Sequence, residues 1–235
     1  MSSPFRVAVV AEGPTDKIVI EAAISNIFGG QPFILRQLQP EESLAFSPIG
    51  TGWGGVYRWC RQASTRAGGP IRHDPLFLTY DLLILHLDAE VASESYANAG
   101  ITDPANDLPC SKPCPPPEAS TDALRDVMLR WIGETGMPPK TVLCTPSTMT
   151  ETWVLCALYP DVAAAIPGNL ECFQTPDHRL QAQPKVGRLV RGGKKDRRMY
   201  QKRAGEIAQA WDRVRHHCSE AGKFSTDLTA FVPEA

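Results

Sequence analysis

Short apolar runs alternate with amphipathic stretches along this chain. Residues 5–11 (FRVAVVA) and 81–87 (DLLILHL) are mostly apolar, and residues 141–145 (TVLCT) form a third, shorter run. Runs of this length, rich in valine, leucine and isoleucine, are typical of strands that are buried on both faces of a sheet. Residues 33–38 are the candidate for a further strand.

Apolar residues recur at helical spacing between these runs. The spacing predicts helices over residues 17–28, 56–67, 121–135, 151–159 and 200–221. Strands that alternate with helices predict an α/β fold with a mostly parallel, doubly wound (Rossmann-like) central sheet and helices on both faces. The last of these helices would form a C-terminal helical extension.

A polar stretch broken by prolines interrupts the pattern at residues 91–120. Because it offers little to bury, we expect an inserted, mobile loop rather than a link between domains. The expected organisation is one domain over residues 1–160 that carries this insertion. Residues 161–235 then add a basic loop and the C-terminal helix, packed on the same domain.

The composition narrows the choice of partners and compartment. Hydrophobic residues make up 43% and charged residues 21% of the 235 residues, as in ordinary globular proteins. The net charge of −2 gives no overall attraction to nucleic acid, so any such attraction must be local. No apolar run is long enough to span a bilayer, and residues 1–6 lack the pattern of a signal peptide. We therefore expect a cytoplasmic protein without a membrane partner.

The seven cysteines favour the same compartment. Their odd number, and the place of Cys144 and Cys156 in apolar segments, fit a reducing cytosol better than a disulfide framework. Cys110 and Cys114 are separated by three residues in the proline-rich stretch, which is a poor match to a tight zinc site. We expect both to be solvent-exposed free thiols.

Acidic residues follow three of the predicted strands. Glu12 and Asp16 follow the first, Asp88 and Glu90 follow the 81–87 strand, and Glu151 follows the 141–145 strand after a short turn. In open parallel sheets, ligands bind beyond the carboxyl ends of the strands. Alternate residues of an extended segment face the same side, so Asp88 and Glu90 can aim at one cation. Carboxylate oxygens suit Mg²⁺ or Mn²⁺, which makes all five residues candidate metal ligands.

A structural role is the alternative for two of these acids. Asp16 is placed equally well to cap the helix that follows the first strand. Glu151, taken alone, is more often a solvated or capping residue. Asp88 and Glu90 favour a functional role, because both follow an apolar strand directly.

Residues 191–203 form the one dense basic stretch, with Asp196 as its single acid. Such a stretch can hold a phosphate backbone without reading its sequence, and Gly192-Gly193 would let it move. A solvated charged loop is the alternative. The candidate nucleic-acid-binding residues are Arg191, Lys194, Lys195, Arg197 and Arg198.

The order and spacing of the acidic motifs resemble the TOPRIM domain of topoisomerases, primases and the OLD (overcoming lysogenization defect) nucleases. In that family a glutamate follows the first strand and an Asp-x-Asp pair follows a later one. Glu12 and Asp88 match these positions, whereas Glu90 departs from the pair. The OLD branch shows Glu-x-x-x-Asp at the first site, which Glu12 and Asp16 match, and a later glutamate, for which Glu151 is the candidate.

The OLD-type nucleases also have a downstream lysine. Lys185, Lys194, Lys195 and Lys202 compete for that position in this chain. Lys202 is favoured, because Tyr200-Gln201-Lys202 looks like the Tyr-x-Lys stretch of small stand-alone TOPRIM-like bacterial proteins of unassigned function. The resemblance thus implies Glu12, Asp88 and Lys202, with Lys195 as a second lysine, as catalytic residues.

The function that this resemblance implies is metal-dependent hydrolysis of nucleic acid, DNA above all, in bacterial defence or repair. Two metals would activate a water and stabilise the leaving oxygen, while a lysine offsets charge on the phosphate. OLD nucleases carry an ATPase domain, but this chain has no phosphate-binding Gly-x-x-x-x-Gly-Lys motif, so it would need a separate ATPase or effector protein.

Two other functions stay open. One is a non-catalytic, metal-dependent phosphate- or nucleotide-binding module that acts through a partner protein. The other is a receiver-like phosphoacceptor. Receivers are much shorter and place an acidic pair directly after the first strand, which makes this alternative the weaker one.

Overall fold

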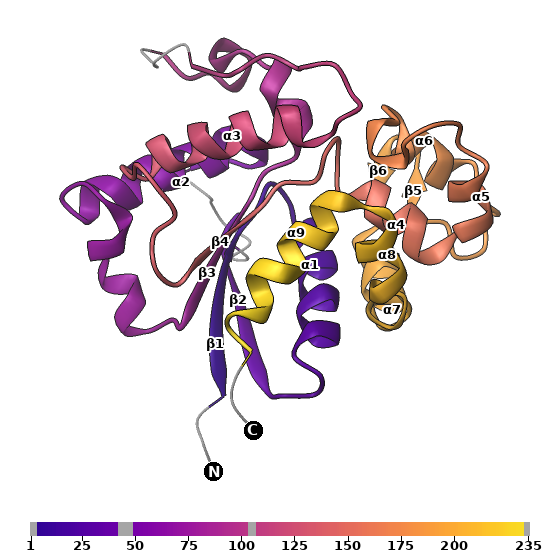
Figure 1. Cartoon of the computed structure of the whole chain (residues 1–235), viewed down its shortest axis with the longest axis horizontal. Coiled ribbons are helices and arrows are strands. Elements are labelled where there is room, and N and C mark those ends of the chain that lie inside the picture. Colours follow the sequence, from indigo (N-terminus) through magenta and orange to yellow (C-terminus); the bar gives the residue numbers. More distant parts are fainter. Residues whose placement is uncertain (1–3, 42–48, 103–106, 233–235) are drawn as a thin grey trace.

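The computed structural model describes residues 4–41, 49–102 and 107–232. Four strands form one sheet in the order β2-β1-β3-β4, and every neighbouring pair is parallel. This confirms the predicted α/β fold with a parallel central sheet (Figure 1). The strands are β1 (Phe5–Val10), β2 (Phe33–Gln39), β3 (Leu82–His86) and β4 (Thr141–Cys144).

The register of the sheet brings the ends of three strands to one edge. Val10 of β1 is the partner of Leu85 in β3, and His86 of β3 is the partner of Cys144 in β4. The residues that directly follow these strands therefore emerge side by side. Because all strands run the same way, this is the carboxyl edge, where open sheets bind their ligands.

Both faces of the sheet are buried, which explains the nearly continuous apolar runs. Val7 and Val9 pack with the first helix and the C-terminal helices, whereas Ala8 and Val10 pack with the second and third helices. Figure 1 shows these two helical layers on opposite sides of the sheet. The three helices are α1 (Pro14–Ile27), α2 (Gly52–Arg66) and α3 (Glu118–Trp131).

The C-terminal part is helical but more broken than the sequence pattern suggests. The single helix predicted over residues 200–221 is wrong, because the chain leaves helical geometry at Ala210 and Cys218. The bends let Trp211 contact Trp153 edge-to-face while Phe224 stacks on Trp153 in the same core. The helices are α4 (Glu151–Leu158), α5 (Pro160–Ala164), α6 (Pro176–Gln181), α7 (Arg197–Gln209), α8 (Trp211–His217) and α9 (Ser219–Thr229).

Short elements complete the fold. A two-stranded antiparallel hairpin joins β5 (Val190–Arg191) to β6 (Lys194–Lys195) and leads into α7. In the described part of the chain no helix is both long enough and apolar enough to cross a membrane. The 3-10 helices are η1 (Ile71–His73), η2 (Pro75–Leu78), η3 (Ala89–Ser93), η4 (Tyr96–Ala99) and η5 (Leu170–Cys172).

Part of the 91–120 segment packs on the core, contrary to the expectation of a loop with little to bury, although most of its described residues are exposed or half-buried. Tyr96 is only 3% exposed; its hydroxyl donates to Asp107 over 2.7 Å and accepts from the indole of Trp131 over 2.9 Å. Leu108 also lies against the core of the α2–α3 face. The aromatic ring and its two hydrogen bonds anchor a segment whose composition alone looks unpacked. Residues 103–106 of the expected loop lie outside the described part.

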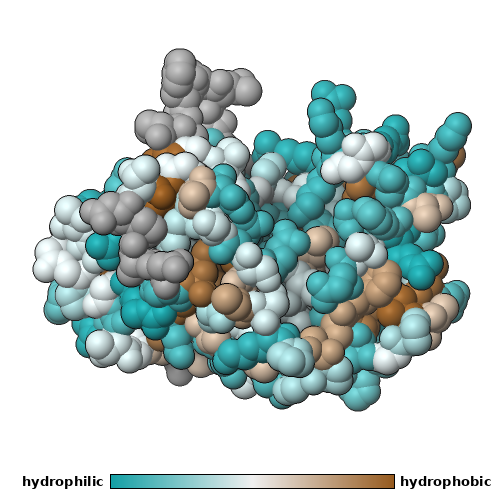
Figure 2. Space-filling view, turned by 90° about the horizontal axis from the view of Figure 1, so that it is seen from above, coloured by the Kyte–Doolittle hydropathy of each residue, from teal (hydrophilic) through white to brown (hydrophobic). Residues whose placement is uncertain are grey.

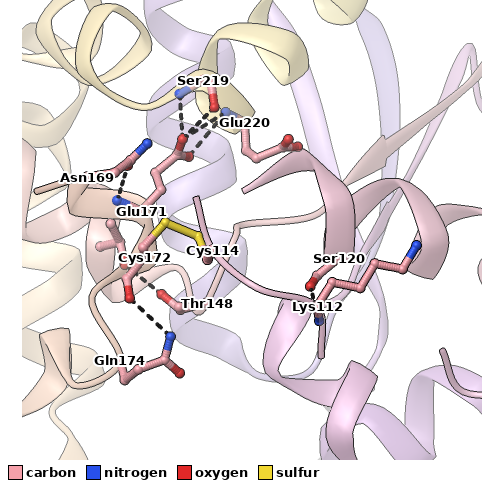
Figure 3. Close-up of a disulfide and its surroundings, with 11 residues drawn as sticks. Lys112, Cys114, Ser120, Thr148, Asn169, Glu171, Cys172, Gln174, Ser219 and Glu220 are labelled. Atoms are coloured by element: carbon pink, nitrogen blue, oxygen red, sulfur yellow. Dashed lines mark hydrogen bonds between the residues drawn. A yellow bond between two sulfur atoms is a disulfide. The ribbon is translucent and has the colours of Figure 1, made fainter. Parts of the chain in front are cut away.

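A disulfide joins the same segment to the C-terminal half. Cys114 pairs with Cys172, 58 residues further on (Figure 3), so the expectation of a free thiol at Cys114 is wrong. Cys110 is free and exposed, as predicted, and the other free cysteines of the described chain are buried. Only the fold brings Cys172 of η5 beside Cys114, since nothing in the spacing of the cysteines reveals the pairing.

Candidate metal centre

Polar and charged side chains gather where β1, β3 and β4 end. Glu12 follows β1, Asp16 lies in the first turn of α1, and Asp88 follows β3. His86 is the last residue of β3, and Glu151 begins α4. Strand ends in register and two helix starts therefore place these five residues at one edge of the sheet.

Glu12 and Asp88 lie together across neighbouring strands. The Oε1 atom of Glu12 accepts a hydrogen bond from the backbone N–H of Asp88 over 2.8 Å. Glu12, His86 and Asp88 each offer one ligand atom, and these atoms all lie within 4.8 Å of one another. His86 and Asp88 are buried, while Glu12 is half-buried. These three residues can hold a metal ion.

The β4–α4 turn holds Asp88 in place. Its Oδ1 atom accepts from the N–H of Thr150 over 3.0 Å and from the Thr150 hydroxyl over 3.1 Å. The Nε2 atom of His86 lies 2.9 Å from that hydroxyl and 3.3 Å from Asp88 Oδ1. Thr150 therefore orients both Asp88 and His86, although the sequence pattern gives Thr150 no role at the site.

Asp16 contacts the backbone of Gly13 with one carboxylate oxygen and faces Lys195 with the other. Its Oδ2 atom accepts from the N–H of Gly13 over 2.9 Å, which is the capping role considered above. Its buried Oδ1 atom receives no hydrogen bond from any described residue and lies 3.5 Å from the ammonium nitrogen of Lys195. Capping therefore uses one oxygen and leaves the other directed at the cluster.

Glu151 is fully buried, which rules out a solvated role. Its Oε1 atom accepts from the hydroxyl of Tyr200 over 2.7 Å, and its Oε2 atom lies 2.8 Å from Lys195 Nζ. The side chain of Lys195 as a whole is 35% exposed, and its ammonium group faces Glu151 and Asp16. Tyr200 and Lys195 are therefore the groups that make a buried Glu151 tolerable.

Glu90 stands at the rim rather than inside. The chain turns into η3 directly after Asp88, because the N–H groups of Ala89 and Glu90 bond to Pro146 and Thr148 of the β4–α4 loop. The expected extended Asp88–Glu90 pair is therefore wrong. Glu90 is exposed, but it still lines the cavity in front of the cluster.

The carboxylates crowd one another, and their pKa values show it. Loss of water raises the pKa of Glu12 well above its usual value, and the charges of Asp88 and Asp16 add to this rise. Partial burial and the charge of Asp88 raise the pKa of Glu90 to about 7. Burial also raises the pKa of Glu151, against the opposing charge of Lys195. These three glutamates therefore give up their protons less readily than free glutamates, and a bound cation would oppose that effect. Asp88 differs, because burial is outweighed by the hydrogen bond and charge of His86, which lower its pKa.

The negative charges around them also raise the pKa values of the two basic groups of the cluster, which keeps both groups protonated. Burial lowers the pKa of His86, but its hydrogen bond to Asp88 and the charges of Asp88, Asp16 and Glu12 outweigh burial and raise the pKa to about 9. For Lys195, the charges of Glu151, Asp16 and Asp88 likewise outweigh burial and raise its pKa well above the usual value. Both groups are cations in a negative field.

An open cavity of about 330 Å³ gives access to the cluster. Between the two halves of the molecule, the surface seen from the carboxyl ends of the strands is largely hydrophilic (Figure 2). Buried polar atoms normally have partners, yet Asp16 Oδ1 and His86 Nδ1 have no hydrogen bond within the described part of the chain. A nitrogen and several carboxylate oxygens around such a cavity fit a divalent ion. The lining residues are Glu12, Gly13, Pro14, Thr15, Asp16, Asp88, Glu90, Lys195 and Arg197.

The basic stretch contributes two side chains to this cavity. Lys195 and Arg197 line it. Arg191 lies 3.7 Å from Asp196 on its own segment, and Lys194 and Arg198 are exposed on the hairpin and on α7. The predicted stretch thus divides into residues at the site and residues on the surrounding surface.

Lys202, the favoured catalytic lysine, lies elsewhere. It is exposed on α7, and its charge acts on Glu206. Two residues along a helix differ by about 200° in direction, so Lys202 points away from the side on which Tyr200 reaches Glu151. The Tyr-x-Lys motif therefore marks the site through its tyrosine, and Lys195 is the lysine that the fold brings to the carboxylates.

His86 and Tyr200 are the main residues that the sequence pattern did not assign to the site. His86 sits inside a predicted buried strand, where a single histidine reads as part of the core. Its spacing of two residues from Asp88 is the signal that could have revealed it, because alternate strand residues share a face. Tyr200 enters the sequence pattern only as a neighbour of Lys202.

Comparison of this chain with protein-family models, with curated proteins and with solved structures finds no match. The resemblance to the TOPRIM family therefore stays a prediction. Functional inference must rest on the residues at the carboxyl edge of the sheet and on the cavity in front of them.

Proposed function

We propose that this protein is a divalent-metal-dependent phosphodiesterase that hydrolyses nucleic acid. One observation carries the proposal. Glu12 and Asp88 offer ligand atoms that lie within 4.8 Å of one another and of the buried His86, and both acids line a cavity that Lys195 and Arg197 also line. Ligands for a cation and positive groups for a phosphate therefore stand side by side, which is the arrangement that phosphoryl chemistry needs.

Glu12, His86 and Asp88 would hold the ion in this proposal, and the imidazolium of His86 would lose its proton to solvent as the ion binds. An imidazole nitrogen among carboxylates favours Mn²⁺, since Mg²⁺ prefers oxygen ligands and octahedral geometry. A bound ion lowers the pKa of a coordinated water and neutralises charge on phosphate oxygens. Thr150 fixes the direction of Asp88, so that the ligand does not have to be ordered when the ion arrives.

Lys195 and Arg197 would hold the phosphate. Lys195 is positioned through Glu151, and Glu151 is positioned through the Tyr200 hydroxyl. An ammonium fixed this way can offset charge that grows on the phosphate in the transition state. Tyr200 and Glu151 therefore act as positioning residues for the lysine.

The wider setting of the proposal rests on the resemblance to OLD-type nucleases. It comprises DNA as the substrate, bacterial defence or repair as the context, and a separate ATPase or effector as the partner. The proposal includes a cytoplasmic location, where nucleic acid is found. Free cysteines at five positions support that location, although the Cys114–Cys172 bridge weakens the argument from cysteine usage.

The test is incubation of the full chain with supercoiled plasmid and with single-stranded DNA, in Mn²⁺, in Mg²⁺ and in chelator. We expect cleavage that requires metal and is faster in Mn²⁺. The variant K195A should lower the turnover number more than the affinity, whereas K202A should leave both nearly unchanged. Equal losses for the two lysine variants would contradict the role given to Lys195.

A non-catalytic phosphate- or nucleotide-binding module is the second candidate. Two observations favour it: the cavity of about 330 Å³ suits a small ligand, and Arg191 and Arg203 are paired with acids of their own segment rather than free for a long backbone. Metal-dependent binding of nucleoside phosphates in calorimetry, without cleavage of either DNA substrate, would select this function instead.

A further inference from the structure

We propose that this site binds one divalent ion, and that the ammonium group of Lys195 occupies the position of a second cation between Asp16 and Glu151. This inference rests on the metal-dependent function proposed above and defines how many ions that function uses. It replaces the pair of metals that the family resemblance implies with one metal and one amino-acid cation.

The carboxylates divide into two groups by what they face. Glu12 and Asp88 share a point with His86. Asp16 and Glu151 instead face Lys195, whose nitrogen lies 3.5 Å from Asp16 Oδ1 and 2.8 Å from Glu151 Oε2. The second group already has a positive charge at its centre.

The second group has few oxygens left for a metal. Glu151 Oε1 accepts the Tyr200 hydroxyl, and Asp16 Oδ2 accepts the Gly13 N–H. The remaining oxygen of each acid faces the ammonium group. A second divalent ion would have to displace Lys195 from both of these oxygens before it could bind them.

The backbone on both sides of Lys195 is held. The hairpin strand β5 is anchored by Val190, which is 1% exposed, and the N–H of Asp196 donates to the carbonyl of Leu189 over 2.8 Å. Asp196 also caps α7, since its side chain accepts from the N–H of Met199 over 3.2 Å. Lys195 therefore enters the cluster from a fixed point, as a resident group of the site.

The charges explain why one ion suffices. Four carboxylates line the cavity, those of Glu12, Asp16, Asp88 and Glu90. Lys195 faces Asp16 and the buried Glu151, and so neutralises part of the negative charge before any metal binds. One divalent ion at Glu12, His86 and Asp88 then leaves the two carboxylate groups with one cation each. A phosphate that enters the cavity would meet the ion on one side and the ammonium group on the other.

The experiment counts bound Mn²⁺ by equilibrium dialysis and calorimetry on the full chain. We expect one ion in the wild type and one in K194M, an exposed neighbour on the same hairpin that serves as the matched control. K195M should bind two ions, because it vacates the second position and leaves Asp16 and Glu151 available. The double variant K195M/E151Q should return to one.

The outcomes separate this inference from the proposed function. Two ions in the wild type, or one in a folded K195M, would overturn the inference while the metal site stands. No ion in the wild type would overturn the proposed function itself. If K195M does not fold, the variant D16N/E151Q decides: we expect it to keep one ion with affinity within about threefold, and loss of that ion would contradict the division into two groups.

Discussion

Two buried carboxylate clusters of this protein differ in how their charges are satisfied. At the ends of the strands, Asp16 Oδ1 and His86 Nδ1 remain without hydrogen bonds among the described residues. Around Glu171 the situation is reversed. That side chain, only 1% exposed, accepts from the N–H and hydroxyl of Ser219 over 2.6 and 2.7 Å and from the N–H of Glu220 over 3.1 Å (Figure 3).

The Glu171 cluster is closed by protein groups alone. Glu171 satisfies N–H groups at the start of α9, which a helix cannot bond internally. Glu220 pairs with Arg125 of α3, and Arg125 also binds Asp122 over 2.8 Å. Burial is therefore no guide to function in this molecule. The difference that matters is that the Glu171 cluster is closed to solvent and bonded to the protein, whereas Glu12, Asp16 and Asp88 line an open cavity.

The comparison predicts its largest effect for a ligand variant, D88N. Hydrolysis should fall by more than about 100-fold, since even indirect partners of metal ligands contribute 10- to 100-fold. The rise in melting temperature on adding Mn²⁺ should also vanish. Stability in chelator should fall, because burial is outweighed by the hydrogen bond and charge of His86 and by the charge of Lys195, which hold the pKa of Asp88 below its usual value and so stabilise its charged form. Thermal melts and DNA cleavage measure the two effects. D122N, an exposed acid of the Glu171 region, should keep a normal response to Mn²⁺; a normal response in D88N would show that Asp88 is no ligand.

The Glu171 cluster should stabilise the fold equally with and without metal. R125M leaves the buried Glu220 without its partner and should lower the free energy of unfolding by about 3–5 kcal/mol in Mn²⁺ and in chelator alike. Urea unfolding measures the change. R130M on the same helix removes an exposed pair with Asp107 and should change stability by less than about 1 kcal/mol. A loss in R125M that Mn²⁺ restores would erase the distinction between the clusters.

Loss of the Cys114–Cys172 disulfide, which adjoins the Glu171 cluster, should give the next largest loss of stability. C114S opens a covalent loop of 58 residues and should lower the free energy of unfolding by about 2–4 kcal/mol. The matched variant C110S changes an exposed free thiol on the same segment and should be nearly neutral. Unfolding under non-reducing conditions tests both. Equal stability of the two variants would mean that the bridge does not form in solution.

The smallest predicted effect concerns pH. Glu90 has its pKa raised to about 7 in the folded protein, so it favours folding when protonated, and this contribution is lost as the pH rises from about 4.5 to 7. In chelator, E90Q should equal the wild type at pH 4.5 and exceed it above pH 7 by at most about 1 kcal/mol, because Glu90 is partly in contact with water. E94Q removes an exposed carboxylate four residues further on and is the matched control. If the stability of E90Q has the same pH dependence as that of the wild type, the charge of Asp88 does not act on Glu90.

Local sequence determined the frame of this protein. The apolar runs at 5–11, 81–87 and 141–145 became β1, β3 and β4, because a strand buried on both faces needs apolar residues at every position. The acids that follow these runs had to meet at one edge once the strands were parallel. Glu12 and Asp88 were therefore predictable as neighbours from their positions alone.

Only the tertiary structure decided which other residues complete the site. Lys195 rather than Lys202 reaches the acids because a short hairpin and the start of α7 direct it there, far along the chain from Asp16. Tyr200 meets Glu151 across 49 residues, and Cys114 meets Cys172 across 58. Such pairings depend on how distant segments pack, and periodicity in the sequence reports only which face of each segment is buried.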